Sequence, residues 1–327
     1  MIEFWIGVDG GGTGTRVRLQ RANGEVLGHG SAGPSGLAHG IAAAWAAIES
    51  GIAAAFEHAC LSRPGNAKMA LGLGLAGVHN KQWAAEFIAH DPGYAMLVLE
   101  TDAFTTLLGA HQGQPGAIVA LGTGSVGEVL LENGQRREVG GWGFPVGDEA
   151  SGAWLGLRAV AQTQQALDGR SRPTRFSDAV LAACGGSKNA LFAWLSQANQ
   201  TRYAQLAPLV LEYASSDAAA LEIMRAAGQE AGKIALALDP AGQLPLALCG
   251  GLASAMQTYL PPAVLTRLVP AHDDAVGGAL HLIRQRLQVS TPPAPTVVAG
   301  SIGASALPGH PALPSSAAPH KEACHVS

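Results

Sequence analysis

The chain has 327 residues, of which 48% are hydrophobic and only 13% are charged, and its formal net charge is −4. This length exceeds what a single hydrophobic core usually serves, so two domains are expected. The small negative charge provides no basic field for nucleic acid or for a membrane surface, and we expect neither as a partner.

The first predicted elements are three strands in succession. The apolar run 4–9 predicts a buried strand, the alternating segment 15–21 predicts a second, and the Asn23-Gly24 turn leads to a third over 25–30. The glycine-rich segment VDGGGTGTR, residues 8–16, therefore joins two strands of a meander. It does not join a strand to a helix.

Two familiar phosphate-binding motifs are excluded at this glycine loop. A Walker A loop carries a lysine at the start of a helix, and no lysine follows these glycines. The dinucleotide fingerprint needs a third glycine where Thr15 stands, and it needs a helix where a strand is predicted.

The remaining patterns alternate between helices and strands. In chain order they predict a helix over 41–60, a buried strand over 68–78, strands over 94–103 and 116–125, helices over 150–167 and 203–238, a strand, glycine pair and helix start over 244–256, and a last helix over 273–287. Residues 290–327 are rich in Pro, Ser and Ala without periodicity, which predicts a disordered tail. We expect domains over 1–115 and 116–289, with the last helix packing back on the first domain.

The glycine loop occurs twice. Gly12-Thr13-Gly14 matches Gly122-Thr123-Gly124, and downstream Asn23-Gly24 matches Asn133-Gly134, all at an offset of 110 residues. A single repeat of this length indicates a duplicated domain. Two such loops across a cleft would clamp a polyphosphate through backbone N–H groups and the hydroxyls of Thr13, Thr15, Thr123 and Ser125. The alternative is a pair of tight β-turns without a ligand.

Several motifs now resemble a known family. DGGGTGTR, GTGS and CGGLASA are similar to the phosphate-1, phosphate-2 and adenosine motifs of the sugar kinase/Hsp70/actin superfamily. LGLAGVHN, TDAFTTLLGAH, GGWGFPVGDEASGAWLGLRAV and DDAVGGAL extend the resemblance to the N-acetylglucosamine and glucosamine kinases of the BadF/BadG/BcrA/BcrD ATPase family. The resemblance runs from about Ile6 to Leu280 and leaves out the tail.

The resemblance implies an α/β fold of duplicated ribonuclease-H-like, actin-like ATPase domains, with ATP in the cleft between them. Asp9 would help to position Mg²⁺, a cation that takes oxygen ligands and few protein carboxylates. The residues implied to bind ATP are Gly10, Gly11, Gly12, Thr13 and Thr15 in the first loop, Gly122, Thr123, Gly124 and Ser125 in the second, and Gly250, Gly251 and Ser254 beside adenosine.

Asp102 follows the predicted strand MLVLET and by resemblance matches the catalytic aspartate of the family. A carboxylate at a strand end can accept the proton of an attacking sugar hydroxyl during phosphoryl transfer. The residues alone leave another reading open, in which Asp102 caps the helix that begins at Ala103, because aspartate is a favoured N-cap.

The segment 140–152 is the predicted sugar site. By resemblance Gly141, Trp142 and Asp148 line the pocket, and Ser35 and Gly77 are expected to add contacts. The alternative is a loop and helix start, in which Asp148 complements the helix dipole. Relatives carry an asparagine that contacts the sugar near GPSG, and Gly36 stands at that place.

The resulting prediction is an ATP- and Mg²⁺-dependent kinase of the 6-hydroxyl of an amino sugar, with N-acetylglucosamine slightly ahead of glucosamine. One alternative is an ATPase that activates a dehydratase, and another is an ATP-dependent regulatory binding protein. Family members include dimers, so a homodimer is an option, although no interface can be read from the sequence.

The expected localisation is cytoplasmic. Cys60, Cys184, Cys249 and Cys324 are far apart and lack metal-ligand spacing, as expected of free thiols. The N-terminus shows no signal-peptide pattern, and no run approaches 18 apolar residues, so no membrane span is expected.

Overall fold

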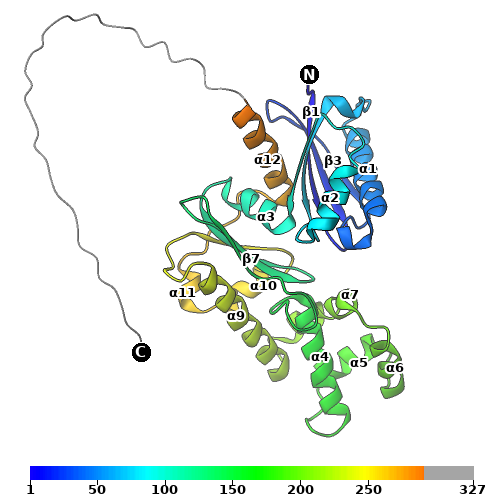
Figure 1. Ribbon diagram of the computed structural model, residues 1–327. Helices are drawn as coiled ribbons and strands as arrows, with labels where there is room; N and C mark the ends of the chain where they lie inside the picture. The colour runs from blue at the N-terminus through cyan, green and yellow to red at the C-terminus, as the bar shows by residue number, and fades with distance from the viewer. Residues whose placement is uncertain (291–327) are drawn as a thin grey trace, which may run out of the picture. The chain divides into compact units, whose positions relative to one another are not determined.

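The computed structural model describes residues 1–290, whose strands form two β-sheets (Figure 1). The predicted tail lies outside the described residues, apart from Ser290 at the end of the last helix. Within residues 1–290, no helix is both long enough and apolar enough to cross a membrane.

The first sheet has five strands in the order β3-β2-β1-β4-β5. These strands are β1 (Phe4–Gly10), β2 (Thr15–Arg21), β3 (Val26–Ala32), β4 (Met69–Leu75) and β5 (Met96–Thr101). β1, β4 and β5 are parallel to one another, whereas β1, β2 and β3 form an antiparallel meander. The three parallel strands therefore end at the same edge of the sheet.

The second sheet repeats this plan with one strand fewer, in the order β8-β7-β6-β9. Its strands are β6 (Gly116–Leu121), β7 (Ser125–Leu130), β8 (Arg136–Gly140) and β9 (Leu246–Cys249). β6, β7 and β8 form an antiparallel meander, and β9 lies parallel to β6 as β4 lies parallel to β1.

The repeat read from the sequence extends to individual hydrogen bonds. In the first meander the Gly24 amide donates to the Arg21 carbonyl at 2.9 Å, and 110 residues later Gly134 donates to Leu131 at 2.9 Å. The glycine loops differ by one residue, because Gly10 pairs with Thr15 whereas Leu121 pairs with Ser125. The extra residue of the first loop therefore lies before Gly12. From Gly12 and Gly122 onward the two halves stay in register.

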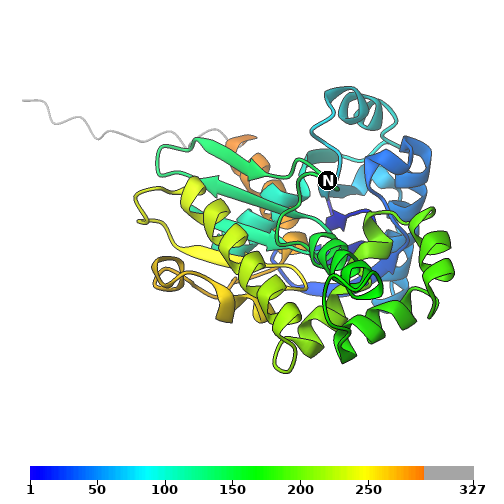
Figure 2. The same ribbon diagram turned by 90° about the horizontal axis from the view of Figure 1, so that it is seen from below.

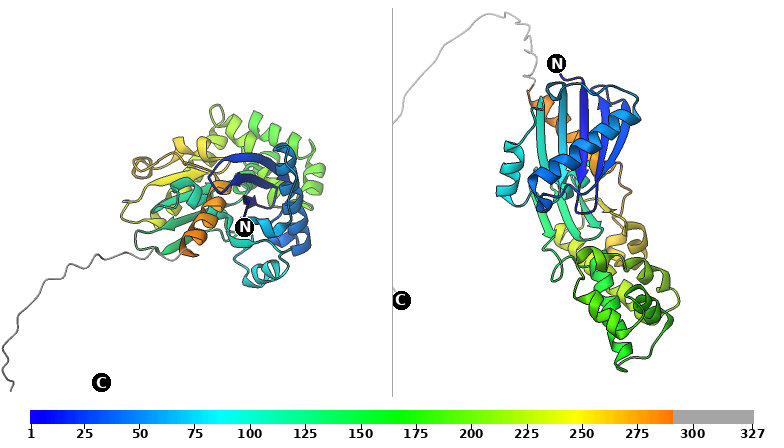
Figure 3. Two further views of the ribbon diagram at one scale, coloured as in Figure 1. Left: turned by 90° about the horizontal axis from the view of Figure 1, so that it is seen from above. Right: turned by 90° about the vertical axis from the view of Figure 1, so that its right-hand side faces the viewer.

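Two helices, α3 (Asp102–His111) and α12 (Ala275–Ser290), lie between the sheets. α12 packs on β1 and β4, where a Cβ at Gly72 would lie 2.1 Å from the Ala279 carbonyl oxygen. The right panel of Figure 3 shows α12 (orange) behind the first sheet and α1 (Ile41–His58) in front of it. Glycine is therefore required in β4 for this close helix approach.

A long helix, α9 (Ala218–Leu238), covers the outer face of the second sheet, as Figure 2 shows in yellow-green. The remaining helices are η1 (Leu37–His39), η2 (Asn66–Lys68), α2 (Lys81–Ala89), α4 (Gly152–Leu167), α5 (Arg175–Ala183), α6 (Lys188–Leu195), α7 (Gln200–Ala204), α8 (Ala207–Tyr213), α10 (Ala253–Met256), η3 (Gln257–Tyr259) and α11 (Pro262–Leu265).

The single helix predicted over 203–238 is wrong. The structure divides this segment among α7, α8 and α9, and it starts α9 anew after Asp217. The Asp217 carboxylate accepts hydrogen bonds from the amides of Ala219 and Ala220 at 2.9 and 3.2 Å. Aspartate at this position favours a new helix start over continuation of the preceding one.

Candidate active site

The candidate site is built at the edge where β1, β4 and β5 end. Strand register aligns Gly10 with Leu75 and Leu75 with Thr101, so these three residues form one row across the sheet. Asp9 precedes the first of them and Asp102 follows the last. The carboxyl ends of parallel strands are where open α/β sheets bind their ligands.

Asp102 is the first residue of α3, but it does not serve as the cap of that helix. The hydroxyl of Thr101 accepts the Phe104 amide at 3.1 Å and fills the N-cap role, whereas the Asp102 carboxylate bonds the adjacent Ala103 amide at 3.0 Å. No side chain in the part of the chain that the structure describes binds this carboxylate. The capping interpretation of Asp102 is therefore not supported.

Burial raises the pKa of Asp102, and the nearby negative charge of Asp9 raises it further, against lowering contributions from the Ala103 amide and from His79. Strand register places both carboxylates at the same edge of the sheet. A carboxylate with a raised pKa and few partners is the pattern expected of a proton acceptor in a ligand site.

Asp9 is paired with Arg16, the residue directly opposite it on β2. The Asp9 Oδ2 atom accepts hydrogen bonds from Arg16 Nε at 3.0 Å and from Nη2 at 2.5 Å. Burial still raises the pKa of Asp9 despite this arginine. A partly buried carboxylate beside the glycine loop fits the oxygen-ligand chemistry of Mg²⁺, with water supplying further ligands.

Two buried hydroxyl groups hold the first glycine loop in place. Thr15 Oγ1 lies 2.7 Å from Ser35 Oγ and 2.6 Å from the Gly33 carbonyl oxygen, and both side chains are buried. A Cβ at Gly10 would lie 2.0 Å from Ser35 Oγ. Thr15 and Ser35, predicted to bind ATP and sugar, thus use their hydroxyls to hold the loop.

The residues at the tip of the same loop have few neighbouring atoms. A Cβ on Gly11 would have no atom within 4 Å, and one on Gly12 would approach only the Nε2 atom of His39, at 3.9 Å. Gly12 and Thr13 are exposed. The loop therefore presents the backbone of Gly12 and Thr13 to a ligand, with His39 beside Gly12, whereas the Gly11 amide donates to the Gly14 carbonyl oxygen at 3.0 Å.

The second glycine loop is held by Asp148. The Asp148 carboxylate accepts the Ser125 amide at 3.2 Å and the Gln200 Nε2 at 2.6 Å, and it is 5% exposed. The Ser125 hydroxyl donates to the Glu149 carbonyl oxygen at 2.6 Å. These bonds occupy two groups expected to bind ligands, while Gly122 and Thr123 stay partly exposed.

The two glycines of the predicted adenosine motif differ in surroundings. Gly250 has a φ of +87°, and a Cβ there would lie 2.4 Å from the Leu121 carbonyl oxygen at the base of the second loop. Gly251 has no atom within 4 Å of a Cβ position, and Ser254 is exposed in α10. Gly250 is thus required by the fold, and Gly251 leaves open space.

Gly141, Trp142 and Asp148, predicted to line the sugar pocket, lie around the second glycine loop. A Cβ on Gly147, the residue before Asp148, would lie 2.8 Å from the Cβ of Trp142, and the Gly141 amide donates to the Ser125 carbonyl oxygen at 3.2 Å. Trp142 is 87% exposed, whereas Asp148 is buried. Gly141, with a φ of +69°, carries the loop past Val126, and Gly77, with a φ of +93°, packs on Leu37 beside the first glycine loop.

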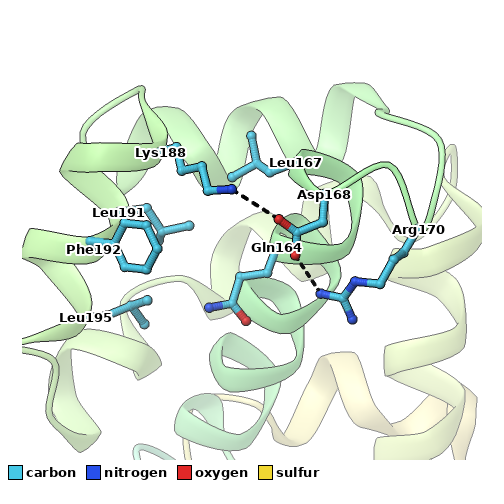
Figure 4. Close-up of a pocket in the computed structure, with 8 residues that line it drawn as sticks. All are labelled: Gln164, Leu167, Asp168, Arg170, Lys188, Leu191, Phe192 and Leu195. Carbon is cyan, nitrogen blue, oxygen red and sulfur yellow. Dashed lines mark hydrogen bonds and ion pairs between the residues drawn. The ribbon is translucent and has the colours of Figure 1, made fainter.

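One surface pocket lies away from these residues, between α4 and α6, with a volume of about 270 Å³ (Figure 4). The charged side chains that line it pair with one another, because Asp168 forms ion pairs with both Arg170 at 3.0 Å and Lys188 at 3.3 Å. None of the predicted site residues lines it. Its full lining is Gln164, Leu167, Asp168, Arg170, Lys188, Leu191, Phe192 and Leu195.

A buried acid, Glu128, lies on β7 near the candidate site. Burial raises its pKa to about 7, although Arg136 Nε, 3.3 Å from its Oε1, opposes the increase. Because this pKa exceeds the ordinary value of 4.5, the folded protein binds the proton more tightly than the unfolded chain does. The stability contributed by Glu128 is complete below pH 4.5 and is lost as pH rises through about 7.

We expect Glu128→Gln to be more stable than the wild type at pH 8, by about 1 to 3 kcal/mol, since one pH unit corresponds to roughly 1.4 kcal/mol. At pH 5 the two proteins should differ much less. Urea unfolding at both pH values measures this, with the exposed Glu132→Gln as the control. Equal stabilities at pH 8 would show that Glu128 is not held as a costly buried charge.

Similar proteins agree with this architecture. The family model described as the BadF/BadG/BcrA/BcrD ATPase family matches residues 6–281. The chain is 33% identical to a glucosamine kinase of Vibrio cholerae over 280 residues, which are 85% of this chain and 95% of that protein. A candidate N-acetylglucosamine kinase from Chromobacterium violaceum has a solved structure that matches at 53% identity with a TM-score of 0.85, covering 86% of this chain and 99% of that one.

A more distant structure supports the fold alone. The ROK family glucokinase from Streptomyces griseus matches with a TM-score of 0.52 at 19% identity, over 86% of this chain and 99% of that one. The predicted α/β fold of duplicated ribonuclease-H-like, actin-like ATPase domains is thereby confirmed. With a family model matched over most of its length and two repeated meanders carrying the glycine loops, the chain belongs to the BadF/BadG/BcrA/BcrD ATPase family.

Proposed function

We propose that this protein is an ATP- and Mg²⁺-dependent kinase that transfers a phosphoryl group to the 6-hydroxyl of an amino sugar. The observation that carries the proposal is the placement of Asp102. This carboxylate has a raised pKa, binds no side chain within residues 1–290, and lies beside Asp9 at the edge that also carries the first glycine loop. The names of the relatives, a glucosamine kinase and a candidate N-acetylglucosamine kinase, support the substrate class.

In this proposal the glycine loops bind ATP through their backbone. Gly12 and Thr13 would contact its phosphates from the first loop, and Thr123 from the second, since these are exposed or partly exposed. The Gly11 and Gly122 amides are used within the loops, where they donate to the Gly14 and Gly124 carbonyl oxygens at 3.0 and 2.9 Å. Thr15, Ser35 and Asp148 would act indirectly by fixing the two loops. Gly251 would leave room for adenosine.

Asp9 would hold Mg²⁺ together with water and phosphate oxygens, and the bound ion would neutralise charge on the transferring phosphoryl group. Arg16 fixes the orientation of the Asp9 carboxylate through two hydrogen bonds to Oδ2. Asp102 would accept the proton of the sugar hydroxyl as that oxygen attacks the terminal phosphate of ATP. The proton leaves the hydroxyl, a bond forms between that oxygen and phosphorus, and ADP departs.

The proposal is tested by measuring ADP release with N-acetylglucosamine, glucosamine, N-acetylmannosamine, glucose and no sugar. We expect an amino sugar to raise the rate well above the sugar-free rate, with N-acetylglucosamine slightly ahead. ADP release that no sugar stimulates would instead favour an ATPase that drives another protein.

Gly36 offers a test of sugar preference. Its backbone, with φ −59° and ψ 136°, is open to any residue, and a Cβ there would lie 3.4 Å from the nearest atoms, in Gly11, at ordinary contact distance. If an asparagine amide here reaches the acceptor sugar, Gly36→Asn should raise kcat/KM for its preferred sugar by about 2- to 10-fold, the effect of one hydrogen bond. Gly36→Ala provides the same Cβ without the amide and is the control. Equal sugar preference in both variants would show that this position does not contact the sugar.

A further inference from the structure

A group of charged side chains joins the two sheets close to Asp102. On β8, Arg136 and Glu138 are two residues apart and so lie on the same face of the strand. Arg136 Nη1 lies 3.1 Å from Glu100 Oε2 on β5, and Glu138 Oε2 lies 3.6 Å from His79 Nε2 after β4. Both contacts cross from the second meander to the first sheet.

Arg136 makes three separate contacts from this position. Besides Glu100, its Nε lies 3.3 Å from the Oε1 atom of the buried Glu128. Its guanidinium carbon lies 3.2 Å from the centre of the Phe104 ring, the geometry of a cation–π contact. A planar guanidinium suits this combination of two carboxylates and an aromatic face better than an ammonium does.

The two residues that Arg136 contacts on the first half of the chain flank the candidate base. Glu100 precedes Asp102 by two residues at the end of β5, and Phe104 follows it by two residues in the first turn of α3. Phe104 is 8% exposed and belongs to the apolar layer between the sheets. Arg136 therefore holds both sides of the bend at which Asp102 stands.

We propose that Arg136 is a positioning residue for phosphoryl transfer, which fixes the Asp102 carboxylate by holding Glu100 and Phe104. The inference rests on the proposed function, in which Asp102 accepts the proton. Small displacements of a reacting group lower the rate of the chemical step more than they change substrate binding. The loss of Arg136 should therefore reduce kcat and leave both KM values nearly unchanged.

The neighbouring arginine is a matched control. Arg137 points to the opposite face of β8, where its guanidinium donates a hydrogen bond to the Leu238 carbonyl oxygen at the end of α9. Arg137→Met thus removes an arginine and a contact from the same strand but leaves the contacts with the first sheet in place.

The experiment compares Arg136→Met, Arg136→Lys, Glu100→Gln and Arg137→Met in steady-state kinetics and in hydrogen–deuterium exchange. We expect Arg136→Met to lower kcat about tenfold or more, with KM for ATP and sugar within about twofold, and Arg136→Lys to recover part of the loss. Exchange over residues 98–108 should rise in Arg136→Met and not in Arg137→Met. Glu100→Gln should also lower kcat. The double variant of Glu100→Gln and Arg136→Met should have a kcat only slightly below that of Arg136→Met alone.

Three results would overturn the proposal. They are unchanged exchange over 98–108 in Arg136→Met, a kcat within twofold of the Arg137→Met value, and a KM for ATP that rises in step with the loss of kcat. If Arg136→Met does not fold, Arg136→Lys and Glu100→Gln carry the same comparison. Because exchange is measured without sugar, it shows whether Arg136 holds residues 98–108 even if no sugar stimulates ADP release. Absence of sugar stimulation would count against the proposed function, whereas unchanged exchange would count against the role of Arg136.

Discussion

Asp102→Asn is expected to lower kcat for sugar phosphorylation by about 10²- to 10⁴-fold, the usual contribution of a general base. Asparagine has nearly the same shape and can still accept the Ala103 amide, so KM for ATP and for sugar should change little. Steady-state kinetics of ADP release, with each substrate varied in turn, measures both quantities. Undiminished turnover in this variant would contradict the assignment of the base.

The same substitution should make the protein more stable at neutral pH. The pKa of Asp102 is raised in the folded state, so its stability contribution is present below the ordinary value of 3.8 and is lost as pH rises. Asparagine is uncharged, so Asp102→Asn does not lose this stability as pH rises. Thr101→Ala is the matched control, because it deletes the true N-cap and should cost about 1 kcal/mol while most of the turnover remains.

A stability change of the opposite sign would change the interpretation of Asp102. If Asp102→Asn unfolds at lower urea concentration than the wild type at pH 7.5, the carboxylate stabilises the helix start and burial is not its dominant effect. Urea unfolding of both variants at pH 7.5 and pH 4.5 separates these outcomes, because the expected gain from asparagine shrinks toward the lower pH.

Gly250→Ala and Gly251→Ala should affect stability very differently, although the two residues are adjacent. At Gly250 an alanine combines a φ of +87° with a Cβ 2.4 Å from the Leu121 carbonyl oxygen, and we expect a loss of about 3 kcal/mol or more in stability. At Gly251 no atom lies within 4 Å of the new Cβ, so the fold should be unaffected. Urea unfolding measures this difference directly.

Nucleotide binding completes the comparison. If adenosine approaches the backbone at Gly251, the added methyl group occupies its space, and Gly251→Ala should weaken ADP binding by about tenfold, as judged by calorimetry. An unchanged ADP affinity in a folded Gly251→Ala protein would remove this residue from the adenosine site. A fully stable Gly250→Ala protein would show that the backbone at this turn adjusts more readily than its geometry indicates.

The sequence predicted the elements that position the site because their signals are local. The Asn23-Gly24 and Asn133-Gly134 turns fix the two meanders, and both appear with the same hydrogen bonds. The strands before the glycine loop and before Asp102 are short apolar runs, and they form β1 and β5. Periodicity did not show the break before α9, which depends on the capping carboxylate of Asp217.

The contacts that decide the role of each polar residue could not be predicted, because they join residues far apart in the chain. Ser35 is directed to Thr15 by the packing of β3 and η1 against the first loop, and Asp148 is occupied by Gln200, 52 residues away. Arg136 reaches Glu100 only because the two sheets meet at α3. A carboxylate or hydroxyl that the sequence predicts to bind a ligand can therefore be engaged in hydrogen bonds or ion pairs within the fold.

In the proposed reaction, the terminal phosphoryl group of ATP moves to the 6-hydroxyl of an amino sugar with Asp102 as the base. Phosphorus NMR of the wild type with ATP, Mg²⁺ and equal amounts of N-acetylglucosamine and glucosamine tests it most directly. We predict a phosphomonoester signal coupled to the C6 protons of an amino sugar, which Asp102→Asn does not produce on the same time scale. ADP and inorganic phosphate without a sugar ester, or the same ester formed at an equal rate by Asp102→Asn, would contradict the proposed reaction.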